Sequence, residues 1–212
     1  AGRGTKTYVM MCQSKRAGYE RQHTALDLHD RKCDQNLARL HKAGIKGVRT
    51  VSGDACELDA VLTSFDTMLG KPVLFDTVFI DAPCSGTGTM RRHPEIPWRL
   101  AENDVTTELP RLQLTMLKEA AARVAAGGEL IYATCSVFDE ENAQVVDAFL
   151  SSPEGADFSL APLSEAQILQ LPEFEQAKKL ISVRQNDRGL FQSVPVNADS
   201  YDGHFCARLV RK

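Results

Sequence analysis

The feature that most constrains the fold of this chain is a repeated alternation of strand-like and helix-like segments. Apolar runs typical of buried strands cover residues 23–28, 47–55, 73–84 and 129–137. Helix-like segments precede, separate and follow these runs, at residues 6–18, 30–44, 56–69, 108–126 and 139–152. Strands that alternate with helices predict an α/β fold with a mostly parallel sheet and helices on both faces.

Some ends of these segments can also be predicted. Residues 108–126 carry apolar side chains at three- and four-residue intervals, and Gly127 and Gly128 are expected to end this helix. Asp139 is placed to cap the helix that follows. Residues 189–195 and 204–211, separated by a turn-rich stretch, indicate a closing β hairpin. Residues 151–185 have mixed character, and no element is assigned to them.

Composition narrows the class of protein. A chain of 212 residues that is 43% hydrophobic is expected to form one domain, residues 1–212, around a sizeable core. The net charge of −3 gives no general attraction to nucleic acid, so any such binding must use a local patch. The N-terminus lacks the apolar segment of a signal peptide, and no run is long enough to span a membrane. We therefore expect a cytoplasmic protein that acts as a monomer and not at a membrane.

The cysteines are scattered and form no Cys-x-x-Cys pair, so neither a metal site nor a redox dithiol is predicted. Ligands of open α/β sheets bind beyond the carboxyl ends of the strands. Polar residues that fall at or near those ends are Asp27, Asp54, Asp81, Cys84 and Cys135. Such positions suit an acid that holds ribose hydroxyls and a thiol that acts as a nucleophile.

Each of these residues also has a simpler interpretation. Asp27 can cap a helix, and Gly2 and Gly4 can be ordinary loop glycines. Lone cysteines are more often small buried side chains than nucleophiles. Cys84 and Cys135, however, follow consecutive strands, which are usually neighbours in such a sheet. We therefore expect these two thiols and the Asp81 carboxylate to share one crevice.

Three longer stretches carry a family resemblance. "FIDAPCSGTGTMRRHPEIPW", "GGELIYATCSVFDEENAQVV" and "DSYDGHFCARL" closely resemble the RNA cytosine-5 methyltransferases of the Sun/Nop2 family, in particular the branch that methylates bacterial 16S ribosomal RNA. The resemblance covers nearly the whole chain, including His204 and Phe205 near its end. It implies a Rossmann-like methyltransferase fold, S-adenosylmethionine as cofactor and RNA, in particular ribosomal RNA, as partner.

The resemblance also implies residue roles. Cys135 matches the family's nucleophile, Cys84 the cysteine of product release, and Asp81 the acid at the methyl-transfer site, which also borders the cofactor. Asp27 matches the acid on the cofactor ribose, and Asp54 the acid near its adenine. The methionine-binding loop matches Ala1, Gly2, Arg3, Gly4, Thr5 and Lys6. From the residues alone the order of the two thiols stays open, because DNA cytosine methyltransferases attack with a Pro-Cys cysteine.

The opening of the chain departs from the family. The loop usually reads Cys-Ala-Ala-Pro-Gly-Gly-Lys, whereas Arg3 and Thr5 stand here where proline and glycine are usual. A glycine loop of this kind normally follows a strand. We therefore expect the first strand of the fold, and the helical RNA-binding domain that relatives often carry, to lie outside residues 1–212.

A basic and aromatic cluster follows the Pro-Cys loop. It consists of Arg91, Arg92, His93, Trp98 and Arg99, which suit phosphate contacts and stacking on an extruded base. The alternative is a solvated charged loop in which Trp98 is a packing anchor. Three other functions stay open: methylation of another RNA such as tRNA, methylation of a small molecule or protein, and RNA binding without catalysis.

Overall fold

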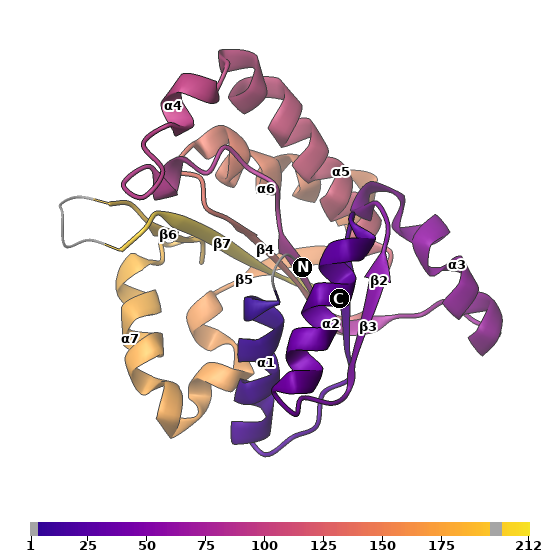
Figure 1. Ribbon diagram of the computed structural model, residues 1–212. Helices are drawn as coiled ribbons and strands as arrows, with labels where there is room; N and C mark the ends of the chain where they lie inside the picture. The colour runs from indigo at the N-terminus through magenta and orange to yellow at the C-terminus, as the bar shows by residue number, and fades with distance from the viewer. Residues whose placement is uncertain (1–3, 196–200) are drawn as a thin grey trace. The chain divides into compact units, whose positions relative to one another are not determined.

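The computed structural model describes residues 4–195 and 201–212, which divide into two units, Ala1–Val73 and Leu74–Lys212 (Figure 1). The first unit contains two parallel strands, β1 and β2, which run in register from His23 opposite Val48 to Asp27 opposite Ser52. Its elements are α1 (Thr5–Arg16), β1 (His23–Asp27), α2 (Asp30–Lys42), β2 (Val48–Ser52), a 3-10 turn (Ala55–Glu57) and α3 (Leu58–Leu69).

Helix α2 illustrates how the sequence forms these elements. Its buried side chains Cys33, Asn36 and Leu40 recur every three to four residues and so lie on one face. Gly44 follows in the left-handed conformation with φ 71°, and the Ile45 N–H donates to the Leu40 carbonyl (3.0 Å). This glycine-dependent turn ends the helix and starts the return toward β2.

The second unit has a mixed sheet of order β3-β4-β7-β5, with β6 also paired to β7. Strands β3 and β4 are parallel, whereas β7 runs antiparallel to β4, β5 and β6. The strands are β3 (Phe75–Asp81), β4 (Val124–Thr134), β5 (Phe158–Ala161), β6 (Phe191–Ser193) and β7 (His204–Arg211). The predicted Rossmann-like fold with a closing hairpin is confirmed by these elements.

The helices of this unit are α4 (Ile96–Arg99), α5 (Leu109–Ala121), α6 (Ala143–Leu150) and α7 (Glu175–Arg184). A π-helical turn, Asp104–Glu108, precedes α5. Short 3-10 turns cover Thr87–Thr89, Asp139–Glu141, Pro153–Gly155, Leu163–Glu165, Gln167–Gln170 and Pro172–Phe174. Figure 1 shows α5 and α6 together on one side of the strands and α7 apart from them. Residues 151–185, which the sequence left unassigned, form β5, α7 and several of these turns.

The core of the second unit lies between the sheet and helices α5 and α6. Alternate residues of β4 and β7 face inward, so Leu130, Tyr132, Ala207 and Leu209 are almost fully buried. The helices add Leu117, Val146 and Phe149. The Phe149 ring packs edge-on against that of Phe158, with ring centroids 5.5 Å apart. Neighbouring strands β3 and β4 are thereby held rigidly at their carboxyl ends.

Two predicted helix boundaries are wrong. Helix α5 ends at Ala121, and β4 has already begun at Val124. Gly127 and Gly128 therefore lie inside a strand, where the pairing with β3 shifts register. Gly127 has φ 72°, and a Cβ on Gly128 would lie 2.9 Å from the Asp76 carbonyl oxygen. These glycines accommodate an irregularity in the strand instead of ending a helix.

Asp139 does not cap α6 as predicted, because it lies in the preceding 3-10 turn and Asn142 directly precedes the helix. The helix N-terminus has no side-chain cap, since the Asn142 amide is bonded elsewhere. Within residues 4–195 and 201–212, no helix combines the length and apolarity needed to cross a bilayer.

The core makes a first prediction. Replacing fully buried Phe149 with Ala removes its packing against Phe158 and leaves a cavity, so the free energy of unfolding should fall by about 3 to 5 kcal/mol. The control is Val183→Ala on α7, whose side chain is 83% exposed and should change stability by less than about 0.5 kcal/mol. Urea denaturation measures both, and equal losses would contradict this account of the core.

Candidate functional site

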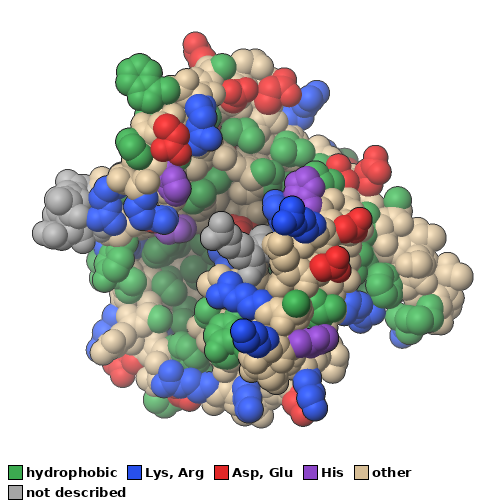
Figure 2. All heavy atoms as spheres, in the orientation of Figure 1, with side chains coloured by type: hydrophobic (Ala, Val, Ile, Leu, Met, Phe, Trp, Pro, Cys, Tyr) green, Lys and Arg blue, Asp and Glu red, His purple; other side chains and the backbone are tan. Residues whose placement is uncertain are grey.

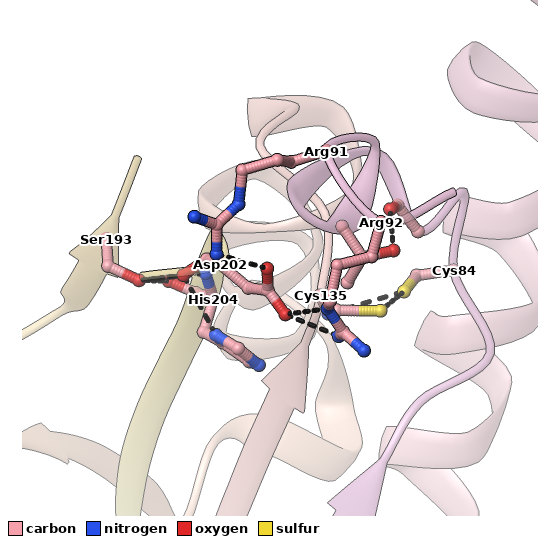
Figure 3. Close-up of polar contacts among 9 residues, drawn as sticks. Cys84, Arg91, Arg92, Cys135, Ser193, Asp202 and His204 are labelled. Carbon is pink, nitrogen blue, oxygen red and sulfur yellow. Dashed lines mark hydrogen bonds and ion pairs between the residues drawn. The ribbon is translucent and has the colours of Figure 1, made fainter. Parts of the chain in front are cut away.

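Two cysteine side chains meet at the carboxyl ends of β3 and β4. Cys84 lies three residues beyond β3, and Cys135 directly follows β4. Their Sγ atoms are 3.3 Å apart, and the Cys135 backbone N–H donates to Cys84 Sγ at 3.4 Å (Figure 3). The expectation that consecutive parallel strands bring these thiols into one crevice agrees with this geometry.

The two thiols are hydrogen-bonded, and either sulfur can be the donor. The hydrogen bond to Cys135 is the largest cause that raises the pKa of the Cys84 thiol, and burial raises it further. Cys84 therefore stays a thiol at neutral pH and can donate this hydrogen bond to Cys135. A thiolate is a stronger nucleophile than a thiol, so the raised pKa of Cys84 favours Cys135 over Cys84 as the reactive sulfur.

The fully buried carboxylate of Glu141 joins the loops that carry the cysteines. One oxygen, Oε2, accepts from the Ser85 backbone N–H at 2.8 Å and from Gln113 Nε2 at 3.0 Å. The other, Oε1, accepts from Ser136 Oγ at 2.7 Å. Ser85 and Ser136 directly follow the two cysteines in sequence. Glu141 thus fixes both cysteine loops from beneath, and the sequence did not point to it.

Further buried hydrogen bonds hold this connection in place. The Tyr132 hydroxyl donates to the Glu141 carbonyl at 2.6 Å. Asn142 accepts from Thr134 Oγ1 at 2.6 Å and donates to the Ser136 carbonyl at 3.0 Å. Because these groups are almost fully buried, each lost hydrogen bond would leave a polar group unsatisfied. The loop after β4 is therefore restricted to one conformation.

Asp81 is the last residue of β3, opposite Ala133 of β4, and is exposed. Its position at the strand end, three residues before Cys84, is the one predicted. A cavity of about 320 Å³ also borders Cys84, large enough for one nucleobase. It is lined by Cys84, Ser85, Ile96, Arg99, Leu100, Asp104, Glu108 and Leu109.

The predicted basic cluster is exposed but largely paired. Arg92 contacts the Asp202 carboxylate through two nitrogens, and Arg91 lies 3.8 Å from the same group. His93 and Arg99 both lie near Glu95, at 3.6 Å and 3.3 Å. Figure 2 shows basic and histidine side chains gathered between α4 and the ends of β6 and β7. Nothing in the sequence pattern indicates Asp202 as their partner.

Trp98 is 89% exposed, so it is not the packing anchor considered as an alternative. A large aromatic side chain that contributes little to the core is free to stack on a ligand. The indole is therefore compatible with the base-stacking role predicted for it.

Of the residues predicted to bind a cofactor, Asp81 lies in the second unit and all the others lie in the first. Asp27 ends β1 and accepts from the His29 N–H at 3.2 Å, and Asp54 follows β2 and accepts from the Cys56 N–H at 2.8 Å. Gly4 precedes α1 with φ 76°, and a Cβ there would lie 2.0 Å from Asn36 Oδ1. Exposed Thr5 and Lys6 begin α1.

Ala1, Gly2 and Arg3, predicted to belong to the same loop, lie outside the described residues. Elsewhere, the described part of the chain contains no group of three or more His, Cys, Asp or Glu side chains that could hold a metal ion.

The Glu141 network makes a second prediction. In Glu141→Gln, the amide nitrogen must face one of the present donors, so stability should fall by about 2 to 3 kcal/mol in urea denaturation. Cross-linking of Cys84 to Cys135 by a short thiol-reactive reagent should also slow. The control is Asp139→Asn, an exposed acid in the same turn, which should change neither property. Unchanged cross-linking in Glu141→Gln would show that this residue does not set the spacing of the thiols.

Comparison with known proteins connects this site to a family. Ribosomal RNA small subunit methyltransferase B of Escherichia coli O6:K15:H31 (strain 536) is 30% identical over 212 residues, which is 100% of this chain and 41% of that protein. The protein of the same name from Salmonella arizonae is 38% identical over 139 residues, 65% of this chain and 27% of that protein. The chain thus spans less than half the length of these relatives.

Solved structures share the fold. The crystal structure of PH0851 is 28% identical with a TM-score of 0.69, covering 90% of this chain and 37% of that one. NSun6 from Pyrococcus horikoshii with SFG has a TM-score of 0.72 at 20% identity, covering 100% of this chain and 46% of that one. A family model described as 16S rRNA methyltransferase RsmB/F matches residues 1–210. This chain belongs to that family of methyltransferases.

Proposed function

We propose that this chain is the catalytic domain, residues 1–212, of an enzyme that transfers a methyl group from S-adenosylmethionine to carbon 5 of a cytosine in 16S ribosomal RNA. The observation that carries the proposal is the pair of thiols 3.3 Å apart at the ends of neighbouring parallel strands. The family match supports ribosomal RNA as the substrate. In a covalent route to carbon 5, one thiol can add to carbon 6 and the other can assist the later elimination.

The first unit fits the cofactor. Asp27 and Asp54 lie at the carboxyl ends of adjacent parallel strands, where acids can accept hydrogen bonds from ribose hydroxyls and adenine. Gly4 closely approaches Asn36 and begins a helix, so backbone N–H groups at this end can face a charged ligand. The family resemblance adds residues 1–6 and Asp81 to the proposed cofactor contacts. S-adenosylmethionine supplies the methyl group as a positively charged sulfonium.

Cys135 is the proposed nucleophile. Carbon 5 of cytosine is too weakly nucleophilic to attack a sulfonium, but adding a thiolate to carbon 6 converts the ring into an enamine. Cys135 Sγ forms this bond, and the electron pair of the C5–C6 double bond becomes available at carbon 5. Asp81, at the strand end, hydrogen-bonds the base at nitrogen 3 and stabilises the charge that develops there.

Cys84 is the proposed base of the second half-reaction. Its pKa is raised chiefly by the hydrogen bond to Cys135. Once Cys135 is bonded to carbon 6 it is a neutral thioether, and this cause is largely removed. Cys84 can then lose its proton and remove the one on carbon 5. The C5–C6 double bond re-forms, and Cys135 leaves as a thiolate.

The thiols make a third prediction, tested in the intact protein with 16S RNA and S-adenosylmethionine. Cys84→Ala should accumulate a covalent protein–RNA complex that survives denaturant, because methyl transfer occurs but elimination stalls. Cys135→Ala should give neither the complex nor 5-methylcytosine, because no bond to carbon 6 forms. The double variant should behave like Cys135→Ala. Gel electrophoresis and nucleoside mass spectrometry measure these products.

The control is Cys12→Ala, an exposed cysteine on α1, which should retain activity. A complex that appears with Cys135→Ala and is absent with Cys84→Ala would reverse the two roles. Full activity in both single variants would rule out the covalent mechanism. Methylation of tRNA but not of 16S RNA by the unaltered protein would change the substrate and leave the chemistry intact.

The RNA-binding residues make a fourth prediction. Because Trp98 is 89% exposed, Trp98→Ala should leave the free energy of unfolding unchanged within about 0.5 kcal/mol. If the indole stacks on a base, the same change should weaken RNA binding by about 1 to 3 kcal/mol, roughly fivefold to 150-fold in Kd. Trp98→Phe should retain most of the affinity. Equal Kd values for Trp98→Ala and the unaltered protein would exclude the stacking role.

A further inference from the structure

Asp202 lies in a turn that is anchored to the Pro-Cys loop. The next residue, Gly203, donates its backbone N–H to the Gly88 carbonyl at 2.8 Å. Ser193 Oγ donates to the Asp202 carbonyl at 3.1 Å and accepts from the His204 N–H at 3.0 Å (Figure 3). A Cβ on Gly88 would lie 2.2 Å from the Gly203 carbonyl oxygen, so these backbones are in direct contact. The position of Asp202 is therefore well fixed.

The Asp202 carboxylate in turn holds Arg92. Its Oδ2 accepts from Arg92 Nε at 2.8 Å and also from the NH2 group of the same guanidinium. The Asp202 side chain is only 14% exposed, whereas that of Arg92 is 57% exposed. Hydrogen bonds from Arg92 lower the pKa of Asp202, so the acid is ionised at neutral pH. A fixed acid thus orients an otherwise mobile basic side chain.

The same turn reaches the reacting thiols. Gly88, which binds Gly203 through its carbonyl, donates its own N–H to the Cys135 carbonyl at 2.9 Å. In the view of Figure 3 the Arg92 guanidinium is drawn over Cys135, and the two side chains interact electrostatically. Interaction with Cys135 contributes to the raised pKa of Arg92, after the larger contributions from Asp202. By reciprocity, the Arg92 charge favours a negative charge on Cys135.

We propose that Asp202 is a positioning residue that holds the Arg92 guanidinium beside Cys135, where its positive charge stabilises the thiolate. This role rests on the proposed function, since only a nucleophilic Cys135 needs it. It also gives Arg92 a use besides the predicted phosphate contact. The two uses are separable, because a thiolate can be measured without RNA.

Other charged and titratable groups near the thiols also influence how easily the Cys135 thiolate forms. Cys84 and Cys135 share a hydrogen bond, and the buried Glu141 carboxylate accepts from the Ser85 N–H in the Cys84 loop. The groups on the elements around Cys135 are Asp81, Cys84, Arg91, Arg92, Tyr132, Glu141, Asp202 and His204. Arg91 and Arg92 are the two arginines among them, and Arg92 makes the shorter contacts to Asp202.

The direction in which Asp202→Asn changes the ease of forming the Cys135 thiolate distinguishes a positioning role of Asp202 from a direct effect of its charge. Asp202 is itself negative, so removing its charge alone would make a Cys135 thiolate easier to form. Losing the orientation of Arg92 has the opposite effect. If the Cys135 thiolate becomes harder to form in Asp202→Asn, the loss of the Asp202 charge does not explain the change, whereas displacement of the Arg92 guanidinium does.

The experiment measures alkylation of Cys135 by iodoacetamide between pH 6 and 10 in the intact protein, without RNA or cofactor. Peptide mass spectrometry assigns the modified cysteine. The plateau at high pH reports access to the sulfur, and the midpoint reports the ease of forming the thiolate. Asp202→Asn and Arg92→Gln should both react about threefold to tenfold more slowly at pH 7.5, with midpoints at higher pH and similar plateaus. Arg92→Lys, which retains charge but not the two-nitrogen contact, should fall between.

The matched control is Asp147→Asn, which removes the acid of another Arg–Asp pair, that of Arg188, and should leave the profile unchanged. Arg92 is exposed, so Arg92→Gln should fold and provides a test even if Asp202→Asn does not. An unchanged or lower midpoint in either Asp202→Asn or Arg92→Gln would overturn the proposal. Absence of 5-methylcytosine formation by the unaltered protein would instead count against the proposed function, whatever the alkylation profile.

Discussion

The hydrogen bonds of Glu141 are the constraint on which the geometry of the thiol site depends. Removing a carboxylate from water costs several kcal/mol, and only a full set of donors offsets that cost. The Ser85 N–H, Gln113 Nε2 and Ser136 Oγ supply these donors, from α5 and from both cysteine loops. Since the set is incomplete unless both loops are in place, the loops are stabilised together. The 3.3 Å distance between the thiols follows from that arrangement.

Sequence could predict the thiol pair but not the groups that fix it. Cys84 and Cys135 follow strongly apolar runs, and the rule that consecutive parallel strands are neighbours was enough to bring them together. Glu141 follows Asp139 and Glu140, and nothing in the spacing of three adjacent acids shows which one is buried. Asp202 reaches Arg92 across 110 positions of sequence. A contact of this range depends on where β7 joins the sheet, which local patterns do not encode.

The two wrong predictions of helix boundaries also arise from tertiary contacts that local sequence patterns do not encode. Gly127 and Gly128 end helices in most local contexts, and the pattern of apolar residues continued to Val124. In the structure these glycines permit an irregular pairing with β3, in which the Asp76 carbonyl comes too close for a side chain. Likewise, Asn142 precedes α6 without capping it because its amide bonds Thr134 and Ser136. At Gly127–Gly128 and at Asn142, tertiary contacts therefore override the local preference for a helix end or a helix cap.

The charges near the thiols bear on the proposal that this acidic chain acts on RNA. With a net charge of −3 the chain does not attract phosphates as a whole, and the Asp202 carboxylate partly neutralises Arg91 and Arg92. A positive charge that is paired in this way contributes little to long-range attraction but still acts over a few ångströms. In our proposal its main effect is therefore on the Cys135 sulfur. In the proposed function, affinity for RNA therefore depends more on stacking by exposed Trp98 than on these two arginines.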